Sequence, residues 1–121
     1  MLELLLDLVV TAAMASGSAV DSGKAVYERC AGCHSIEMNR TGPHHCGLLG
    51  RRAGTAAGYD TYSEAMKKSG IVWNERTLDA FLAAPTKVVP GTTMTYAGVP
   101  DPSDRRALIA YLAQEKACPR R

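Results

Sequence analysis

The clearest hydrophobic pattern in the chain lies near its C-terminal end. Leu108, Ile109, Tyr111 and Leu112 recur at the spacing of one helix face and form an apolar stripe. Ser103 precedes this stripe, and serine is one of the residues that cap helix N-termini. We therefore expect a final helix that is capped by Ser103 and buries the stripe.

Three shorter helices are indicated by residues that cap or terminate helices. We expect them at residues 24–29, capped by Asp21 or Ser22 and running into Cys30; at residues 63–69, stopped by Gly70; and at residues 75–84, capped by Asn74 and ended by Pro85.

Long stretches between these helices have no period. Residues 41–58 contain five glycines and neither a helical nor a strand pattern, which indicates a structured loop. Pro90 and Gly91 mark a turn. The pattern predicts an all-α chain whose loops are long for so small a domain, and such loops need something to pack against.

Cys30, Cys33 and His34 form a C-x-x-C-H motif, which is the sequence for covalent haem attachment. On the first turns of a helix, residues three apart share a face, so both thiols can form thioethers to one porphyrin while the imidazole faces the iron. A thioredoxin-like dithiol or half of a zinc site are the alternatives. No predicted strand precedes the motif, and Cys46 and Cys118 do not form a second ligand pair, so haem is favoured.

Composition supports a bound prosthetic group. The chain has 121 residues with only one Phe, five Tyr and one Trp, so a buried porphyrin would supply much of the missing apolar volume. The formal net charge of +2 favours neither a nucleic acid nor an anionic membrane as partner.

The N-terminal residues have the composition of an export signal. Residues 2–15 are strongly apolar and end in small residues, although Glu3 and Asp7 stand where basic residues are usual. The run is shorter than the ~20 residues that span a bilayer. We therefore expect a leader at residues 1–20 and one monohaem domain at residues 21–121, in a periplasmic protein; the mitochondrial intermembrane space is less favoured.

Six sequence blocks carry a resemblance to a known family. From about Ser22 to Ala113 the chain resembles a class I cytochrome c of the mitochondrial and bacterial cytochrome c2 type. The blocks, in family order, are Cys30–His34, Gly42–Pro43, Gly47–Arg51, Ser69–Trp73, Val89–Met94 and Ile109–Leu112. The resemblance implies the class I fold, in which helices and long loops wrap one covalent haem.

The resemblance also implies a ligand set. His34 would be the proximal iron ligand, with its other ring N–H held by the carbonyl of Pro43. Met94 would be the distal ligand through its thioether sulfur. Such a six-coordinate iron leaves no open position for a substrate and suits electron transfer rather than catalysis.

Further positions match family contacts. Arg51, Tyr62, Ser63 and Trp73 would surround the inner haem propionate, and Thr92 would support the propionate on the other side. Gly23, Tyr27 and Tyr111 match the crossing of the first and last helices. Ordinary core packing, or a solvated charge for Arg51, is the alternative.

Several positions depart from the family pattern. Phe81 stands where the family commonly has a Tyr that bonds the ligand methionine, and Met66 stands where a buried Asn is usual, so the distal pocket should be drier. His44 and His45 are unusual at their positions, and we expect them to face solvent. By the family's fold a Cys46–Cys118 disulfide is possible, against two free thiols or an intermolecular bridge.

The surface carries fewer basic residues near the expected haem edge than mitochondrial members do. The candidate contacts for an acidic partner are Lys24, Arg29, Lys67, Lys68 and Lys87. Electrostatic steering towards a partner should therefore be weaker.

The expected function is that of a soluble, monomeric carrier of single electrons, and not an enzyme. Candidate partners are a bc1-type reductase, a terminal oxidase, a reaction centre or a periplasmic dehydrogenase. The alternative is a haem enzyme or ligand sensor, peroxidase-like, with an open distal position.

Overall fold

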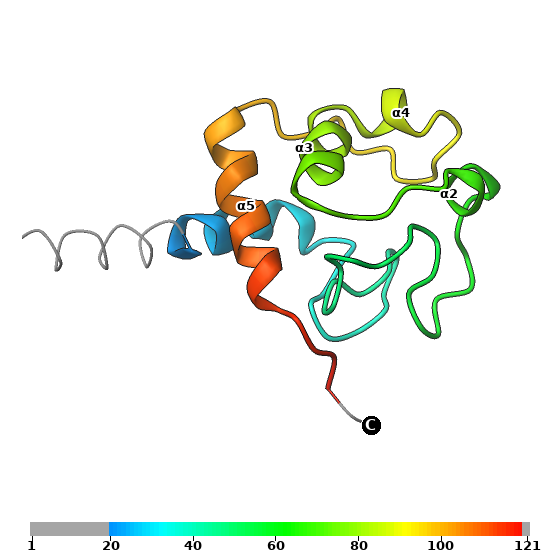
Figure 1. The fold of residues 1–121 in the computed structure, drawn as a ribbon, viewed down its shortest axis with the longest axis horizontal. Coiled ribbons are helices and arrows are strands. Elements are labelled where there is room, and N and C mark those ends of the chain that lie inside the picture. Colours follow the sequence, from blue (N-terminus) through cyan, green and yellow to red (C-terminus); the bar gives the residue numbers. More distant parts are fainter. Residues whose placement is uncertain (1–19, 120–121) are drawn as a thin grey trace, which may run out of the picture.

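The computed structural model describes residues 20–119, and these are helices joined by loops (Figure 1). Residues 20–27 are helical and continue into the short 3-10 helix η2 (Glu28–Cys30). The other helices are α2 (Glu64–Lys68), α3 (Glu75–Ala83), α4 (Pro85–Val88) and α5 (Pro102–Gln114). Within residues 20–119 the β-pairing consists of an isolated bridge between Arg52 and Val72, so the all-α prediction is correct.

The expected leader lies outside the described residues except for residue 20, which is already helical. Asp21 and Ser22 therefore lie inside the first helix and do not cap it. Among the helices of residues 20–119, none has the length and apolarity that crossing a bilayer requires.

The start of α5 also differs from the prediction. Asp101, not Ser103, is the N-cap, because its carboxylate accepts hydrogen bonds from the backbone N–H and the hydroxyl of Ser103, each at 2.7 Å. Pro102 occupies the first helical turn, where its fixed φ suits a helix and its missing N–H leaves no donor unsatisfied.

The predicted cap of α3 is confirmed, whereas Ser63, which is expected as the first residue of a helix at residues 63–69, is instead the N-cap of α2. The Ser63 hydroxyl accepts from Met66 N at 3.1 Å. Asn74 accepts from Thr77 N at 2.9 Å, and the Thr77 hydroxyl accepts in turn from Asn74 N at 2.8 Å, so the two form a reciprocal capping box. Pro85 follows the end of α3 as predicted, and it also begins α4.

The N-terminal helix crosses α5 at Gly23, as expected (Figure 1). A Cβ at this position would collide with the carbonyl oxygen of Ala107 and lie 2.8 Å from Cβ of Tyr111. The ring of Tyr27 packs beside the crossing, with its centroid 5.4 Å from that of Tyr111. Glycine is therefore required for the close approach of the two helices.

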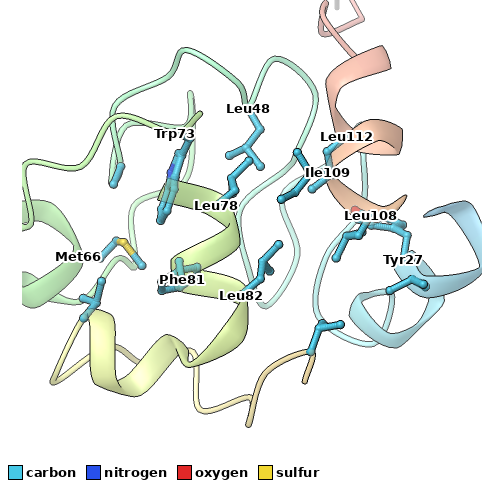
Figure 2. Packing of buried hydrophobic residues seen from close by; sticks show 14 residues of the cluster. Tyr27, Leu48, Met66, Trp73, Leu78, Phe81, Leu82, Leu108, Ile109 and Leu112 are labelled. Atoms are coloured by element: carbon cyan, nitrogen blue, oxygen red, sulfur yellow. The ribbon is translucent and has the colours of Figure 1, made fainter. Parts of the chain in front are cut away.

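The core fills the space between α3 and α5 (Figure 2). Leu78 and Leu82 of α3 face the apolar stripe of α5, where Leu108, Ile109 and Leu112 are buried. The stripe is as predicted, although Tyr111 is only partly buried at its edge. Farther from α5 the core continues through Trp73, Phe81 and Met66.

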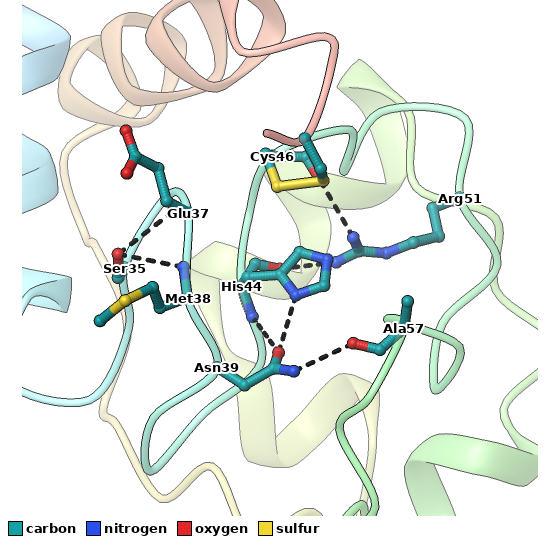
Figure 3. Close-up of a disulfide and its surroundings, with 9 residues drawn as sticks. Ser35, Glu37, Met38, Asn39, His44, Cys46, Arg51 and Ala57 are labelled. Atoms are coloured by element: carbon teal, nitrogen blue, oxygen red, sulfur yellow. Dashed lines mark hydrogen bonds between the residues drawn. A yellow bond between two sulfur atoms is a disulfide. The ribbon is translucent and has the colours of Figure 1, made fainter. Parts of the chain in front are cut away.

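A disulfide joins Cys46 to Cys118, which selects one of the three alternatives (Figure 3). The Cα atoms are 5.0 Å apart and the two residues are 72 positions apart in sequence. Gly47 N also donates to the carbonyl of Glu115 at 2.6 Å, so the segment after α5 is held against the glycine-rich loop.

Candidate haem-binding site

One cavity of about 470 Å³ collects the predicted site residues. Its lining includes all nine of them, namely Cys30, Cys33, His34, Pro43, Arg51, Tyr62, Trp73, Thr92 and Met94. The N-terminal helix, the glycine-rich loop, α3, α5 and the loop after α4 all contribute to its wall. Residues distant in sequence therefore face one space of the size that cofactors occupy in proteins.

The two motif cysteines are free thiols at this cavity. Cys30 ends η2 and is partly buried, whereas Cys33 is exposed. Cys33 N and His34 N both donate to the carbonyl of Cys30, at 3.1 and 2.9 Å. The motif lies in turns at the C-terminal end of a helix, as the predicted helix running into Cys30 implies, and not on the first turns of a helix. These turns bring both thiols and the imidazole to the same cavity.

His34 is held by its neighbours in the loop. The carbonyl of Pro43 lies 2.8 Å from Nδ1 of His34, which is the contact that the resemblance implies. Burial lowers the pKa of His34, so the imidazole is neutral, as an iron ligand must be. Gly42 permits this arrangement, because a Cβ there would collide with the His34 ring.

The segment before Met94 is ordered by Thr92. Gly91 has a φ of +90°, which closes the predicted turn, and Thr92 N donates to the carbonyl of Val89 at 3.0 Å. The buried Thr92 hydroxyl accepts from Met94 N at 3.1 Å. Sequence reasoning placed Thr92 near a propionate and missed this bond to the backbone of Met94.

The other polar residues at the cavity bond to backbone groups. The Arg51 guanidinium donates to the carbonyls of His44 at 2.8 Å and Cys46 at 3.2 Å (Figure 3). The Tyr62 hydroxyl accepts from Ala56 N at 3.1 Å. Burial lowers the pKa of Arg51 and raises that of Tyr62. These bonds fix both side chains at the cavity wall.

Phe81 and Met66 contribute apolar side chains to the cavity wall. Both side chains are buried and line the cavity, and the ring centroids of Phe81 and Trp73 are 5.0 Å apart. A drier distal pocket therefore stays a prediction.

The prediction that His44 and His45 face solvent is wrong. His44 is buried, and its ring and backbone nitrogens bond to Oδ1 of Asn39 at 2.7 and 3.0 Å (Figure 3). His45 lines the cavity beside His34, and burial holds its pKa well below the usual range. Both lie in a loop without any period, so the sequence offered no signal for their burial.

His44, Cys46 and Cys118 also place three potential metal-ligand atoms within 4.8 Å of one another. Both sulfur atoms belong to the disulfide, however, so they cannot act as thiolate ligands in this state.

Two of the five basic contact candidates are engaged in ion pairs. Arg29 bonds Asp104 at 3.1 Å, and Lys67 bonds Glu64 at 2.6 Å. The remaining three, Lys24, Lys68 and Lys87, are exposed.

A helical chain that folds around one apolar cavity, with a C-x-x-C-H motif at its wall, has the architecture of a c-type haem protein. The chain belongs to the cytochrome c family, whose model matches residues 20–116. It is 45% identical to cytochrome c2 of Rhodoblastus acidophilus over 100 residues, covering 80% of this chain and 92% of that protein. It is 43% identical to cytochrome c of Cochliobolus lunatus over 102 residues, covering 82% and 94%.

The fold comparison agrees with the family. Cytochrome cH from Methylobacterium extorquens superposes with a TM-score of 0.76 at 41% identity, covering 78% of this chain and 97% of that one. The prediction of a class I cytochrome c fold is thereby confirmed. Membership of the family means that the chain carries covalently attached haem c with its iron and serves as a haem-based electron carrier for redox partner proteins.

Proposed function

We propose that this chain carries single electrons through one haem c that is attached at Cys30 and Cys33 and ligated by His34 and Met94. The observation that carries the proposal is the single cavity, which brings both free thiols, the imidazole and the thioether together. Bound haem iron supplies a reversible one-electron change between its ferric and ferrous states.

The chain's own residues support each side of this proposal. On the proximal side, Pro43 holds Nδ1 of His34 and so leaves Nε2 as the ligand atom. On the distal side, the Thr92 hydroxyl fixes the backbone of Met94. The ring of His34 and the backbone of Met94 are thus both held by contacts within the protein.

The apolar wall of the cavity excludes water from the bound group. Leu78, Phe81, Leu82, Leu108 and Met66 line the cavity and are buried. A dry and closely packed wall reorganises little when the charge of the bound group changes. Arg51 and Tyr62 place a cation and a hydroxyl at the cavity, where they can support a propionate.

A visible and near-infrared spectrum of the ferric holoprotein tests the ligand set. We expect the weak charge-transfer band of methionine-to-iron ligation and a reversible one-electron redox titration. A five-coordinate spectrum that changes on adding hydrogen peroxide or carbon monoxide would instead support an enzyme or a sensor with an open distal position.

We further propose a periplasmic location and transient contacts with membrane-bound or periplasmic redox proteins as a monomer. The exposed Lys24, Lys68 and Lys87 are the remaining basic contacts that we propose for an acidic partner. With Arg29 and Lys67 already paired, steering should be weak. The rate of electron transfer from a bc1-type reductase, or to a terminal oxidase, should therefore depend only modestly on ionic strength, as stopped-flow kinetics can measure.

A further inference from the structure

The ring of His45 is stacked on the ring of His34. The centroids are 4.2 Å apart and the ring planes differ by 25°. Aromatic rings in contact contribute stabilisation beyond the apolar area that they bury. His45 therefore covers one face of the imidazole that the proposed function assigns as the proximal ligand.

His45 is itself fixed by Tyr27. Nδ1 of His45 lies 2.9 Å from the Tyr27 hydroxyl, and the two rings meet edge to face with centroids 5.6 Å apart. Tyr27 in turn packs on Tyr111 at the helix crossing. The row of rings from Tyr111 through Tyr27 and His45 to His34 joins the crossing of the N-terminal helix and α5 to the His34 side of the cavity.

We propose that His45 is a positioning residue for the haem, whose stacked ring sets the plane of the His34 imidazole and stabilises the ferric state. This inference rests on the proposed function, in which His34 ligates the iron. It concerns the face of the ligand ring, whereas the contact from Pro43 acts on the ring edge at Nδ1.

The direction of the effect on the potential follows from electrostatics. A ligand imidazole is more electron-poor on ferric than on ferrous iron, and the face of an adjacent aromatic ring attracts positive charge. The stacked ring therefore favours the oxidised form and lowers the reduction potential. An aliphatic side chain in the same place lacks this attraction and leaves the ligand ring freer to turn.

The test compares His45→Leu with His45→Phe. Both variants lose the hydrogen bond to Tyr27, and only Phe keeps a ring, so a difference between them reports the stack itself. Proton NMR of the haem methyl groups in the ferric cyanide adduct reports the plane of the proximal imidazole, because cyanide is symmetric about its bond to iron. We expect a wild-type shift pattern for Phe, a changed pattern for Leu, and a higher reduction potential for Leu than for Phe.

The proposal is overturned if Leu and Phe give the same methyl shift pattern and the same potential. Should the Leu variant fail to take up haem, His45→Gln replaces it, since Gln also lacks a ring while retaining a polar group for Tyr27. Measurements on the cyanide adduct separate the role of His45 from the ligand set of the proposed function. If the wild-type spectrum without cyanide shows no methionine ligation, the proposed ligand set fails, and the comparison in cyanide still decides the role of His45.

Discussion

Residues at and beside the cavity are held in place by hydrogen bonds to neighbouring side chains. Met94 is only partly buried, yet its backbone is tied to Thr92, and that hydroxyl bond is worth about 0.5–1.5 kcal/mol. His44 and His45 are tied to Asn39 and Tyr27, respectively. Hydrogen bonds therefore restrict the backbone of Met94 and the side chains of both loop histidines.

Replacing Met94 by Ala should open the distal side of the iron. Because both loop histidines are held by other partners, we expect water to enter rather than a histidine. The reduction potential should fall by on the order of 0.2 V, a part of the ~0.8 V range that axial ligands span. Spectra and potentiometry would check this, and a mutant with the wild-type band and potential would refute the Met94 assignment.

Introducing a hydroxyl at Phe81 should shift the reduction potential. The Phe81 ring is buried at the cavity wall beside Trp73, so a Tyr hydroxyl there must find a partner in a dry site. Comparing the potentials of Phe81→Tyr and Phe81→Leu separates the hydroxyl from altered packing. Equal potentials for the Tyr variant and the wild type would mean that the side chain points elsewhere once haem is bound.

The sequence predicted which residues line the cavity better than it predicted the contacts around them. Cys30, Cys33 and His34 are recognisable because two thioether bonds to haem beside a ligand histidine require that spacing. The stack of His45 on His34 has no such signature, since it forms only when a loop of irregular backbone folds back on the motif. Contacts of this kind depend on tertiary structure and not on local spacing.

At the scale of elements, the sequence predicted the N-terminal helix, α2, α3 and α5, but it missed the short α4 and placed helix ends less well. The cap of α3 at Asn74 has a strong local signal, because Thr77 completes a reciprocal pair. α5 begins at Pro102, two residues earlier than a cap at Ser103 would place it, and Asp101 is therefore its N-cap. The N-terminal helix begins before both of its predicted caps, since residue 20 is already helical.

Removing the cap of α3 should destabilise the protein measurably. Asn74→Ala deletes the acceptor for Thr77 N, and losses of this type average about 1 kcal/mol. Denaturant unfolding of the holoprotein would measure the change. Arg76→Ala, at an exposed position of the same helix, is the matched control. An equal effect of both substitutions would show that the capping box contributes nothing.

At the scale of the whole molecule, the cavity is closed by segments that are far apart in sequence. The glycine-rich loop supplies His34's neighbours on one side, and the loop after α4 supplies Met94 on the other. The disulfide from Cys46 to Cys118 ties that first loop to the segment after α5. The pairing was an open alternative from the sequence, because cysteine spacing alone does not fix connectivity.

The disulfide should contribute less than its loop length implies. A separation of 72 residues corresponds to ~4 kcal/mol in the chain-entropy model. Haem attached to the chain already restricts the unfolded state, so the Cys46→Ser/Cys118→Ser double variant should lose a smaller free energy of unfolding. Single variants serve as controls for the change of side chain.

Thiol counting provides an independent check of the bridge. Alkylation of the denatured, unreduced holoprotein should label no thiol, and two should be labelled after reduction, on a monomer. Two labelled thiols without reductant would rule the disulfide out.

The same bridge has a mechanical consequence. When the two ends of the chain are pulled apart, tension passes through the Cys46–Cys118 bond and leaves the residues between them slack. A separation of 72 residues is about 250 Å of extended chain. The applied force does not extend this segment while the bridge is intact. While the disulfide is intact, a single molecule should therefore stretch only through the residues before Cys46 and the short segment beyond Cys118. Reducing the disulfide should then add the length of the bridged segment in one further step.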